Sequence, residues 1–206
     1  MQNLIQKTLG KMKKKYNPTA IILYGSRSVG DFSAKSDIDL AIFADVTEAF
    51  NDNGEVDGVQ LDAWIYPNEI LECLDNEYLR FFTGQVLLDQ DSKAKNYIKS
   101  IQQKLKVGPT PLTENKKIHI KQWVFKMIAR SEEDNMEGIY RRMWIQTELL
   151  SVYFNLRDQW FLGSKYAFKC LQENDKVAFD LFQLVYMNPN DLKALNQLAQ
   201  YVVEVH

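Results

Sequence analysis

The chain has 206 residues, of which 46% are hydrophobic and 25% are charged, and its formal net charge is −2. These values are ordinary for a soluble globular protein, and the length allows one domain or two small ones. The slightly negative charge argues against a general nucleic-acid-binding protein, which usually carries a strong basic bias.

Two further features of the sequence exclude other classes. The two cysteines, Cys73 and Cys170, lie far apart in apolar contexts and give no sign of a disulfide framework. The first residues lack the apolar core of a signal peptide, and no run reaches the roughly 18 apolar residues of a membrane span. We therefore expect a cytoplasmic protein with no membrane partner.

Apolar spacing predicts alternating helices and strands in the first half. We expect helices at 2–16 and 92–106 and strands at 20–24, 38–43, 59–66 and 85–89. Residues 44–58 are rich in Asn, Asp and Gly, which predicts a connection with one short helix near 46–50. Pro67 suits the first turn of a further helix, in which Ile70, Leu71 and Leu74 share one side.

The second half is wholly helical by its pattern. Two prolines and a glycine at 107–111 stop the preceding helix and stiffen a link. Residues 137–162 are apolar on more than one face, as in the central helix of a bundle, and Gly163 ends that helix. Further apolar stripes predict helices around 120–128 and at 166–171, 177–186 and 192–203, the last capped by Asn190.

The predicted fold class is therefore α+β. We expect a small mixed β-sheet domain with flanking helices at 1–106, followed by an all-α helical bundle domain at 112–206.

Three carboxylates are predicted to gather on one face of the sheet. Residues two apart in a strand point the same way, so Asp37 and Asp39 project together. Asp62 stands within the alternating run 59–66, and an adjacent strand would bring it beside the pair. A divalent cation bound between these carboxylates would explain why negative charges are held together. Such ions keep coordination positions open for substrate phosphates. We predict Asp37, Asp39 and Asp62 as metal ligands and catalytic residues.

The turn before these acids is predicted to hold a phosphate. Gly25 lets the backbone approach a phosphate closely, and Ser26 offers a hydroxyl and an amide at the start of an expected short helical turn. Arg27 is a further phosphate-binding candidate, and a solvated loop charge is an equal alternative. Ser36 completes the predicted nucleotide-binding set in this loop. Together with the acids, these are the parts of a phosphoryl or nucleotidyl transfer site.

The order of three elements resembles that of the nucleotidyltransferase superfamily, which includes DNA polymerase beta. The elements are Gly25-Ser26, then Asp37-x-Asp39 between apolar residues, and then the later strand acid Asp62. The resemblance covers residues 15–90. Within the superfamily, a small N-terminal catalytic domain followed by a helical domain is similar to the antibiotic adenylyltransferases of the aminoglycoside and lincosamide type. It implies two Mg²⁺ ions, ATP or another NTP as substrate, and AMP transfer to a hydroxyl of a small, aminoglycoside-like molecule.

The resemblance also implies two residues in the helical half. In the antibiotic adenylyltransferases a Glu or Asp outside the metal triad often serves as general base, and Glu148, in the apolar stretch IQTELLSVYF, is the candidate. Lys165 is similar to a lysine that contacts the triphosphate in some streptomycin-type enzymes, but Ser151-Val152 stands where those enzymes have an arginine. For Glu148 the alternatives are a salt bridge to Arg141, Arg142 or Arg157 and simple exposure to solvent. For Lys165 the alternative is an exposed lysine at a helix start.

Other functions are compatible with the same residues. One is an antitoxin-like nucleotidyltransferase that binds or AMP-modifies a partner protein, and another is an NTP-binding module without turnover. A transferase acting on an RNA end is disfavoured by the charge balance. As partners we expect a nucleotide and a small-molecule acceptor lying between the sheet and the helical domain, with a homodimer left open. Trp64, which points the same way as Asp62, is expected to line the cleft.

Overall fold

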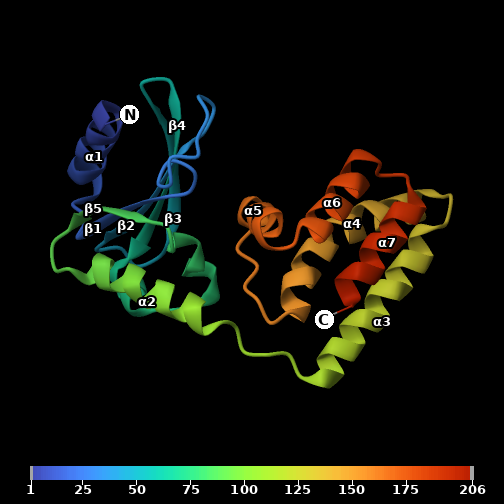
Figure 1. Ribbon diagram of the computed structural model, residues 1–206. Coiled ribbons are helices and arrows are strands. Elements are labelled where there is room, and N and C mark those ends of the chain that lie inside the picture. The colour runs from blue at the N-terminus through green and yellow to red at the C-terminus, as the bar shows by residue number, and fades with distance from the viewer. Residues whose placement is uncertain (1, 205–206) are drawn as a thin grey trace. The chain divides into compact units, whose positions relative to one another are not determined.

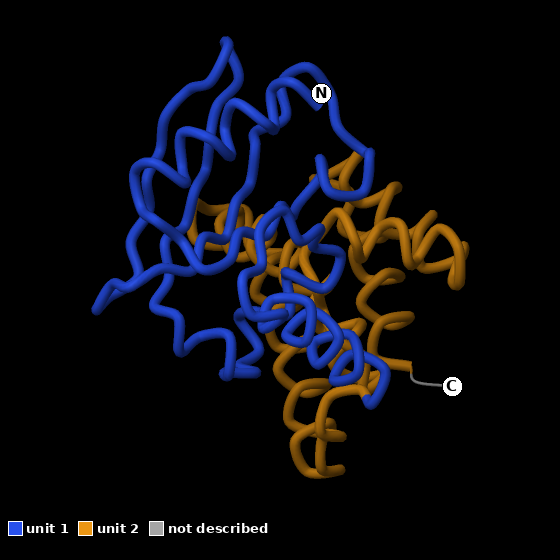
Figure 2. Tube along the Cα trace, turned by 90° about the vertical axis from the view of Figure 1, so that its left-hand side faces the viewer, with its two compact units in different colours: residues 1–107 blue, residues 108–206 orange. Residues whose placement is uncertain are grey.

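The computed structural model describes residues 2–204, and the chain divides into two compact units, residues 1–107 and 108–206 (Figures 1 and 2). The first unit contains a mixed β-sheet with helices, and the second consists of helices. This arrangement confirms the predicted α+β fold class. No helix among the described residues is both long enough and apolar enough to cross a membrane.

The N-terminal unit contains the helices and strands that form the sheet and its cover. They are α1 (Gln2–Tyr16), β1 (Ala20–Tyr24), β2 (Ile38–Ala44), β3 (Phe50–Val56), β4 (Val59–Pro67), the 3-10 helices η1 (Asn68–Glu72) and η2 (Asn76–Phe81), β5 (Gln85–Asp89) and α2 (Lys93–Val107). The four predicted strands and the helices predicted at 2–16 and 92–106 are confirmed to within one residue at each end.

The sheet has the strand order β3-β4-β2-β1-β5. β2 and β4 are parallel, and the other neighbouring strands are antiparallel. The side chains of Ile38 and Leu40 are fully buried and belong to a core cluster with Leu9 and Met12 of α1. Because side chains alternate along a strand, the residues between them lie on the opposite face of the sheet.

That opposite face is covered at one end by aromatic side chains. Phe43 of β2 stacks on Tyr66 of β4 and meets the ring of Tyr97 of α2 edge-on. Tyr66 also contacts Tyr78 and Phe81 of η2. α1 and α2 therefore cover opposite faces of the sheet, and the aromatic contacts extend through Tyr24 and Trp64 toward the acid-bearing end of the second face.

The connection predicted at 44–58 is wrong, because it contains strand β3. The strand is rich in Asn and Asp, which disfavour strands, but it lies at the sheet edge and pairs with β4 along its whole length. Asp57 and Gly58 both have positive φ, 51° and 79°. Asp-Gly in this conformation is the preferred two-residue hairpin turn, and it is the signal that the sequence interpretation missed.

The helix predicted after Pro67 is also wrong. Pro67 is extended, with φ −55° and ψ 146°, and ends β4. Asp75 is extended too and separates η1 from η2, so the segment forms two short 3-10 helices. The short helical turn expected after Gly25 is likewise absent, since residues 26–30 form turns.

The C-terminal unit consists of α3 (Glu114–Ser131), α4 (Met136–Leu156), α5 (Ser164–Asn174), α6 (Lys176–Met187) and α7 (Leu192–Val203). The helix predicted to reach residue 162 ends at Leu156, because Asp158 takes a positive φ of 52°. Its carboxylate is held by Lys117 at 2.7 Å and by the Leu112 amide at 2.9 Å. The predicted cap of α7 is corrected as well: Asp191, not Asn190, accepts from the first backbone amides.

Candidate active site

Asp39 and Asp62 lie next to each other on one face of the sheet. β2 and β4 are adjacent and parallel, and their register pairs Asp39 with Asp62. Neighbouring strands are about 4.8 Å apart, and paired residues point to the same side. Both acids are half-buried. Two carboxylates are therefore held one strand apart on the face opposite α1.

The Gly-Ser turn is packed against the Asp39 carboxylate. Gly25 has a φ of 70°, and a Cβ built at this position would overlap Asp39 Oδ2 and lie 2.9 Å from its Cγ. β1 ends one residue earlier, where Tyr24 pairs with Asp39 in the register. A glycine is thus required at position 25 both by the backbone conformation and by the acid.

A pocket of about 650 Å³ opens beside Asp62. Its lining includes Asp37, which directly precedes β2 and is exposed, and Trp64, two residues beyond Asp62 on β4. The remaining lining residues come from β3 and β4 and are Asn51, Asn53, Gln60 and Leu61. Trp64 therefore lies in the pocket beside Asp62, on the side expected from the strand alternation.

The carboxylates of the acids offer the oxygen ligands that Mg²⁺ prefers, but three of them are not gathered into one preformed metal site. Among residues 2–204 no group of three or more His, Cys, Asp or Glu side chains is gathered closely enough to hold a metal. Mg²⁺ is usually bound through one or two carboxylates together with substrate phosphates. The paired carboxylates of Asp39 and Asp62, packed beside a glycine that leaves the backbone open, fit that mode of binding.

The predicted phosphate-binding residues occupy the loop before β2. Ser26 is half-exposed beside Gly25, and its carbonyl accepts from the Asp31 amide at 3.1 Å. The anion-binding helix start predicted here does not exist, because no helix follows the turn. Ser36 uses its hydroxyl inside the loop, where Oγ accepts from the Ser33 amide at 3.0 Å.

Arg27 is turned inward. Its side chain is only 5% exposed. The guanidinium donates from Nε and Nη2 to the Ser36 carbonyl, at 3.1 and 2.6 Å, and from Nε to the Asp37 carbonyl at 2.9 Å, and it lies over the ring of Phe32. Its observed contacts join the Gly-Ser turn to the backbone in front of β2, which supports a structural role for this arginine over a phosphate contact.

Two residues near the acids were not found from the sequence. Asn51 of β3 donates from Nδ2 to Asp62 Oδ1. Arg80 of η2 donates to the Tyr66 hydroxyl, and its guanidinium carbon lies 6.0 Å from the centre of the Tyr24 ring. Neither residue belongs to a motif, so only the Asp57-Gly58 hairpin signal described above could have indicated Asn51.

The pKa of Tyr24 responds both to Arg80 and to the acids. Burial raises the pKa of the Tyr24 hydroxyl, the Arg80 guanidinium opposes this rise, and the Asp62 and Asp39 carboxylates add to it. Because Tyr24 pairs with Asp39 in the register, the exposed Arg80 is a cation on the acid-bearing face.

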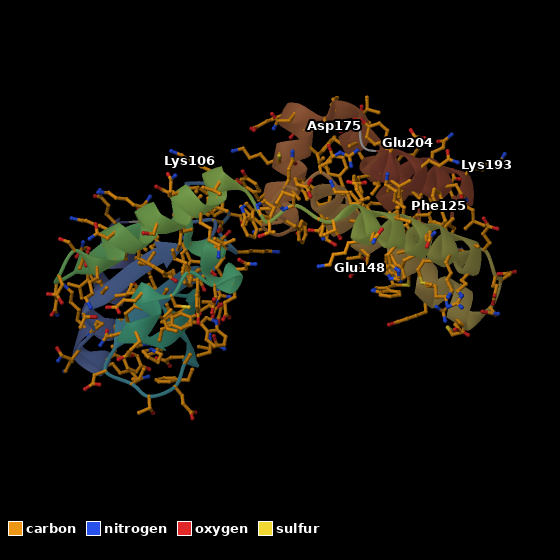
Figure 3. All side chains as sticks on the ribbon, turned by 90° about the horizontal axis from the view of Figure 1, so that it is seen from below. Lys106, Phe125, Glu148, Asp175, Lys193 and Glu204 are labelled. Carbon is orange, nitrogen blue, oxygen red and sulfur yellow. The ribbon has the colours of Figure 1, made fainter. Side chains whose placement is uncertain are left out.

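Glu148 and Lys165 belong to the C-terminal unit. Glu148 is half-buried on α4, and its carboxylate makes no ion pair or hydrogen bond within residues 2–204. In Figure 3 it lies on the side of this unit away from Asp175 and Glu204. Lys165, the second residue of α5, is exposed.

The arginines predicted as alternative partners of Glu148 are engaged elsewhere. Arg141 pairs with Glu137 one turn earlier, and Arg142 donates to the Ser131 carbonyl. Arg157 donates to carbonyls at the end of α7. The salt-bridge interpretation of Glu148 is therefore not observed among the described residues.

Of the comparisons with known proteins, the match to a family model agrees with the motif. Residues 6–93 match the family model of the polymerase beta nucleotidyltransferases. A solved nucleotidyltransferase-like protein from Exiguobacterium sibiricum 255-15 is similar at 8% identity and a TM-score of 0.42, covering 98% of this chain and 73% of the other. No curated protein matches the chain.

Proposed function

The N-terminal unit is a nucleotidyltransferase-type domain of the polymerase beta superfamily, and from this premise we propose that the protein transfers AMP from ATP, or from another NTP, to a hydroxyl of a small molecule. One observation carries the proposal. The Asp39 carboxylate is packed against the Gly-Ser turn and is level with Asp62 on the next strand. A phosphate at the turn would thus be next to two carboxylates that could share Mg²⁺ ions with it, as transfer of a phosphoryl-type group requires.

The residues of the N-terminal unit have separate roles in this proposal. Ser26 and the adjacent amides orient the triphosphate at the open turn that Gly25 provides. Asp39 and Asp62, with Asp37 at the pocket edge, would hold two Mg²⁺ ions together with the substrate phosphates. When bound, these ions neutralise phosphate charge and lower the pKa of the attacking hydroxyl. Arg80 supplies further positive charge on this face, in a position suited to the pyrophosphate group.

Two residues of the C-terminal unit are proposed to take part in the reaction. Glu148, a half-buried carboxylate that no arginine neutralises among the described residues, accepts the proton that the acceptor hydroxyl loses as it attacks. Lys165 at the start of α5 contacts the triphosphate as a point charge. The pocket lined by amides and Trp64 suits a polyhydroxylated acceptor, which amides can hydrogen-bond and an aromatic ring can stack against.

The first experiment is an acceptor screen with labelled ATP and Mg²⁺, read by mass spectrometry of the products. Wild-type protein is expected to release pyrophosphate only when its acceptor is present. Asp39→Asn is expected to lower turnover by at least about a thousandfold, because it removes charge where the reaction needs it, while the circular dichroism spectrum stays native. Retained nucleotidyl transfer by this folded variant would refute the assignment.

A protein acceptor is the second candidate, favoured by exposed apolar side chains on α4. Tyr140 is 67% exposed, Met143 64% and Trp144 40%. Their spacing of three and four residues places Met143 and Trp144 one turn after Tyr140 on the same side of the helix. Adjacent exposed apolar side chains of this size can mark a surface for another protein. Incubation of the protein with labelled ATP and its host lysate distinguishes the two candidates, because a protein acceptor gains a label of one AMP and a small molecule leaves the protein fraction unlabelled.

A further inference from the structure

The β3–β4 hairpin contributes an amide to the candidate active site. Asn51 of β3 and Asp62 of β4 lie on the same face of the sheet, and Asn51 Nδ2 donates a hydrogen bond to Asp62 Oδ1. A carboxylate that accepts a bond from a fixed amide is restrained in its rotamer and in the direction of its plane. Asp62 Oδ2 is then the oxygen that Asn51 leaves unoccupied.

Charge decides which way the Asn51 amide is turned. Its Oδ1 is buried and has no hydrogen-bond partner among residues 2–204, an arrangement that destabilises the fold. Turning the amide over would place that oxygen against the Asp62 carboxylate, and two acceptors repel each other. The Asn51 NH₂ group therefore faces Asp62, although the Asn51 carbonyl oxygen is left without a partner. The orientation of the Asn51 amide thus depends on the Asp62 carboxylate.

We propose that Asn51 is a positioning residue, which orients the Asp62 carboxylate so that it can bind a cation. The inference rests on the proposed function, because it concerns the same site. Hydrogen-bond partners of metal-binding side chains change metal affinity or activity about 10- to 100-fold when they are removed. Asn51 acts here by restricting Asp62 before the cation arrives, so that less side-chain freedom is lost on binding.

Asn53 is a matched control on the same strand. It lies two residues from Asn51, lines the same pocket, and is the residue that the register pairs with Asp62. It is exposed, and its side chain makes no hydrogen bond within the described part of the chain. Both asparagines lie on β3, on the same face of the sheet, and both line the pocket. Of the two, only Asn51 donates a hydrogen bond to Asp62.

The test measures cation binding and does not depend on turnover. Mn²⁺ is titrated calorimetrically into the full-length chain in the presence of a non-hydrolysable ATP analogue. Asn51→Ala is expected to weaken Mn²⁺ binding by about tenfold, and Asn53→Ala to stay within about twofold of wild type. Asn51→Val and Asn53→Val repeat the comparison with a residue that strands favour, so that loosening of the edge strand is controlled.

The outcomes separate this inference from the proposed function. Equal affinities of the Asn51 and Asn53 variants, in a protein whose wild type binds Mn²⁺, overturn the role of Asn51 and leave the proposed function standing. A wild type that binds no Mn²⁺ with the analogue overturns both.

A kinetic readout then separates positioning from general loss of structure. If Asn51→Ala loses only cation affinity, saturating Mg²⁺ is expected to restore its kcat to within about twofold of wild type. A kcat that stays low at saturating Mg²⁺, with native circular dichroism, contradicts a role through cation binding.

Discussion

Two half-buried carboxylates, one in each unit, differ in what binds them. In the C-terminal unit, Asp175 accepts hydrogen bonds from the Tyr153 and Tyr201 hydroxyls at 2.6 and 2.8 Å and from the Ala178 amide at 3.0 Å. Arg157 packs over the Tyr153 ring and donates to backbone carbonyls. In the N-terminal unit, Asp62 is held by one amide at the edge of a pocket.

This difference indicates where function and where stability reside. Polar groups that satisfy one another inside the fold stabilise it, whereas polar groups that converge on a pocket are available to a ligand. Glu148 departs from the pattern of its own unit, because no described residue neutralises it. A substitution of Glu148 is therefore the most direct test of the difference between the two units.

The largest effect is expected for Glu148→Gln. If Glu148 is the general base, kcat falls about 10²- to 10⁴-fold while KM changes little, because glutamine cannot accept the proton. Steady-state pyrophosphate release with the acceptor found in the screen measures both constants. Glu137→Gln on the same helix removes only a surface pair with Arg141 and is expected to leave kcat unchanged. An unchanged kcat for Glu148→Gln would confine the chemistry to the N-terminal unit.

Gly25→Ala tests the role of the N-terminal unit in the reaction. The new methyl group overlaps the Asp39 carboxylate, and displacing a reacting group by about 1 Å can cost about a hundredfold in rate. Gly58→Ala is the matched control, because Gly58 also has a positive φ, 79°, but no atom lies within 4 Å of its added Cβ.

Gly58→Ala is expected to lose about 1 kcal/mol of stability from its backbone conformation. Gly25→Ala is expected to lose more, because its methyl group also overlaps Asp39, and only Gly25→Ala is expected to lose activity. Thermal melts and pyrophosphate release measure the two effects. Equal activity losses in the two variants would show that backbone strain, and not the contact with Asp39, controls the site.

The smallest effect on chemistry, and a measurable one on stability, is expected for Asp175→Asn. Burial disfavours the charged form of Asp175, but hydrogen bonds from Tyr153, the Ala178 amide and Tyr201 outweigh it, so the pKa is lowered from its ordinary value of 3.8. Because the folded-state pKa is the lower one, ionised Asp175 stabilises the fold above pH 3.8, and this stabilisation is lost as the pH falls through the folded-state pKa.

Urea unfolding followed by circular dichroism tests this pH dependence. Asp175→Asn is expected to lose about 1–3 kcal/mol at pH 7, since it weakens a helix cap and two hydroxyl contacts, and less at pH 3. Asp180→Asn, which removes an exposed pair with Lys176 on the same helix, should lose under about 0.5 kcal/mol at either pH. A penalty for Asp175→Asn that grows toward acid pH would contradict the assigned direction.

Much of the sheet was predictable from local pattern, and parts of the site were not. Alternation of acids with Ile38 and Leu40 predicts the face that Asp39 occupies, because the period of a strand is two. The edge strand β3 was missed because its Asn and Asp residues have low strand propensity, and only pairing with β4 makes them a strand. Asn51 could not be placed beside Asp62 without that pairing.

Two charged residues show the same limit. Arg27 stands in the sequence beside Ser26 and looks available to a phosphate, but three hydrogen bonds to the Ser36 and Asp37 carbonyls turn it inward. Arg80 has no motif around it, and it reaches the acid-bearing face because η2 packs its aromatic neighbours on Tyr66. Side-chain direction in loops and 3-10 helices depends on distant partners and has no simple period in the sequence.

The sequence alone determined the order of turn and acids, the faces of the central strands and the helical nature of the second half, because these follow from residue type and spacing over a few positions. Only the tertiary structure decided that Asp39 would be packed on Gly25, that Asp62 would be level with Asp39 and that Asn51 would hold Asp62. Those relations join segments distant in the chain, and they follow from which strands pair with each other, which a pattern over a few neighbouring residues does not contain.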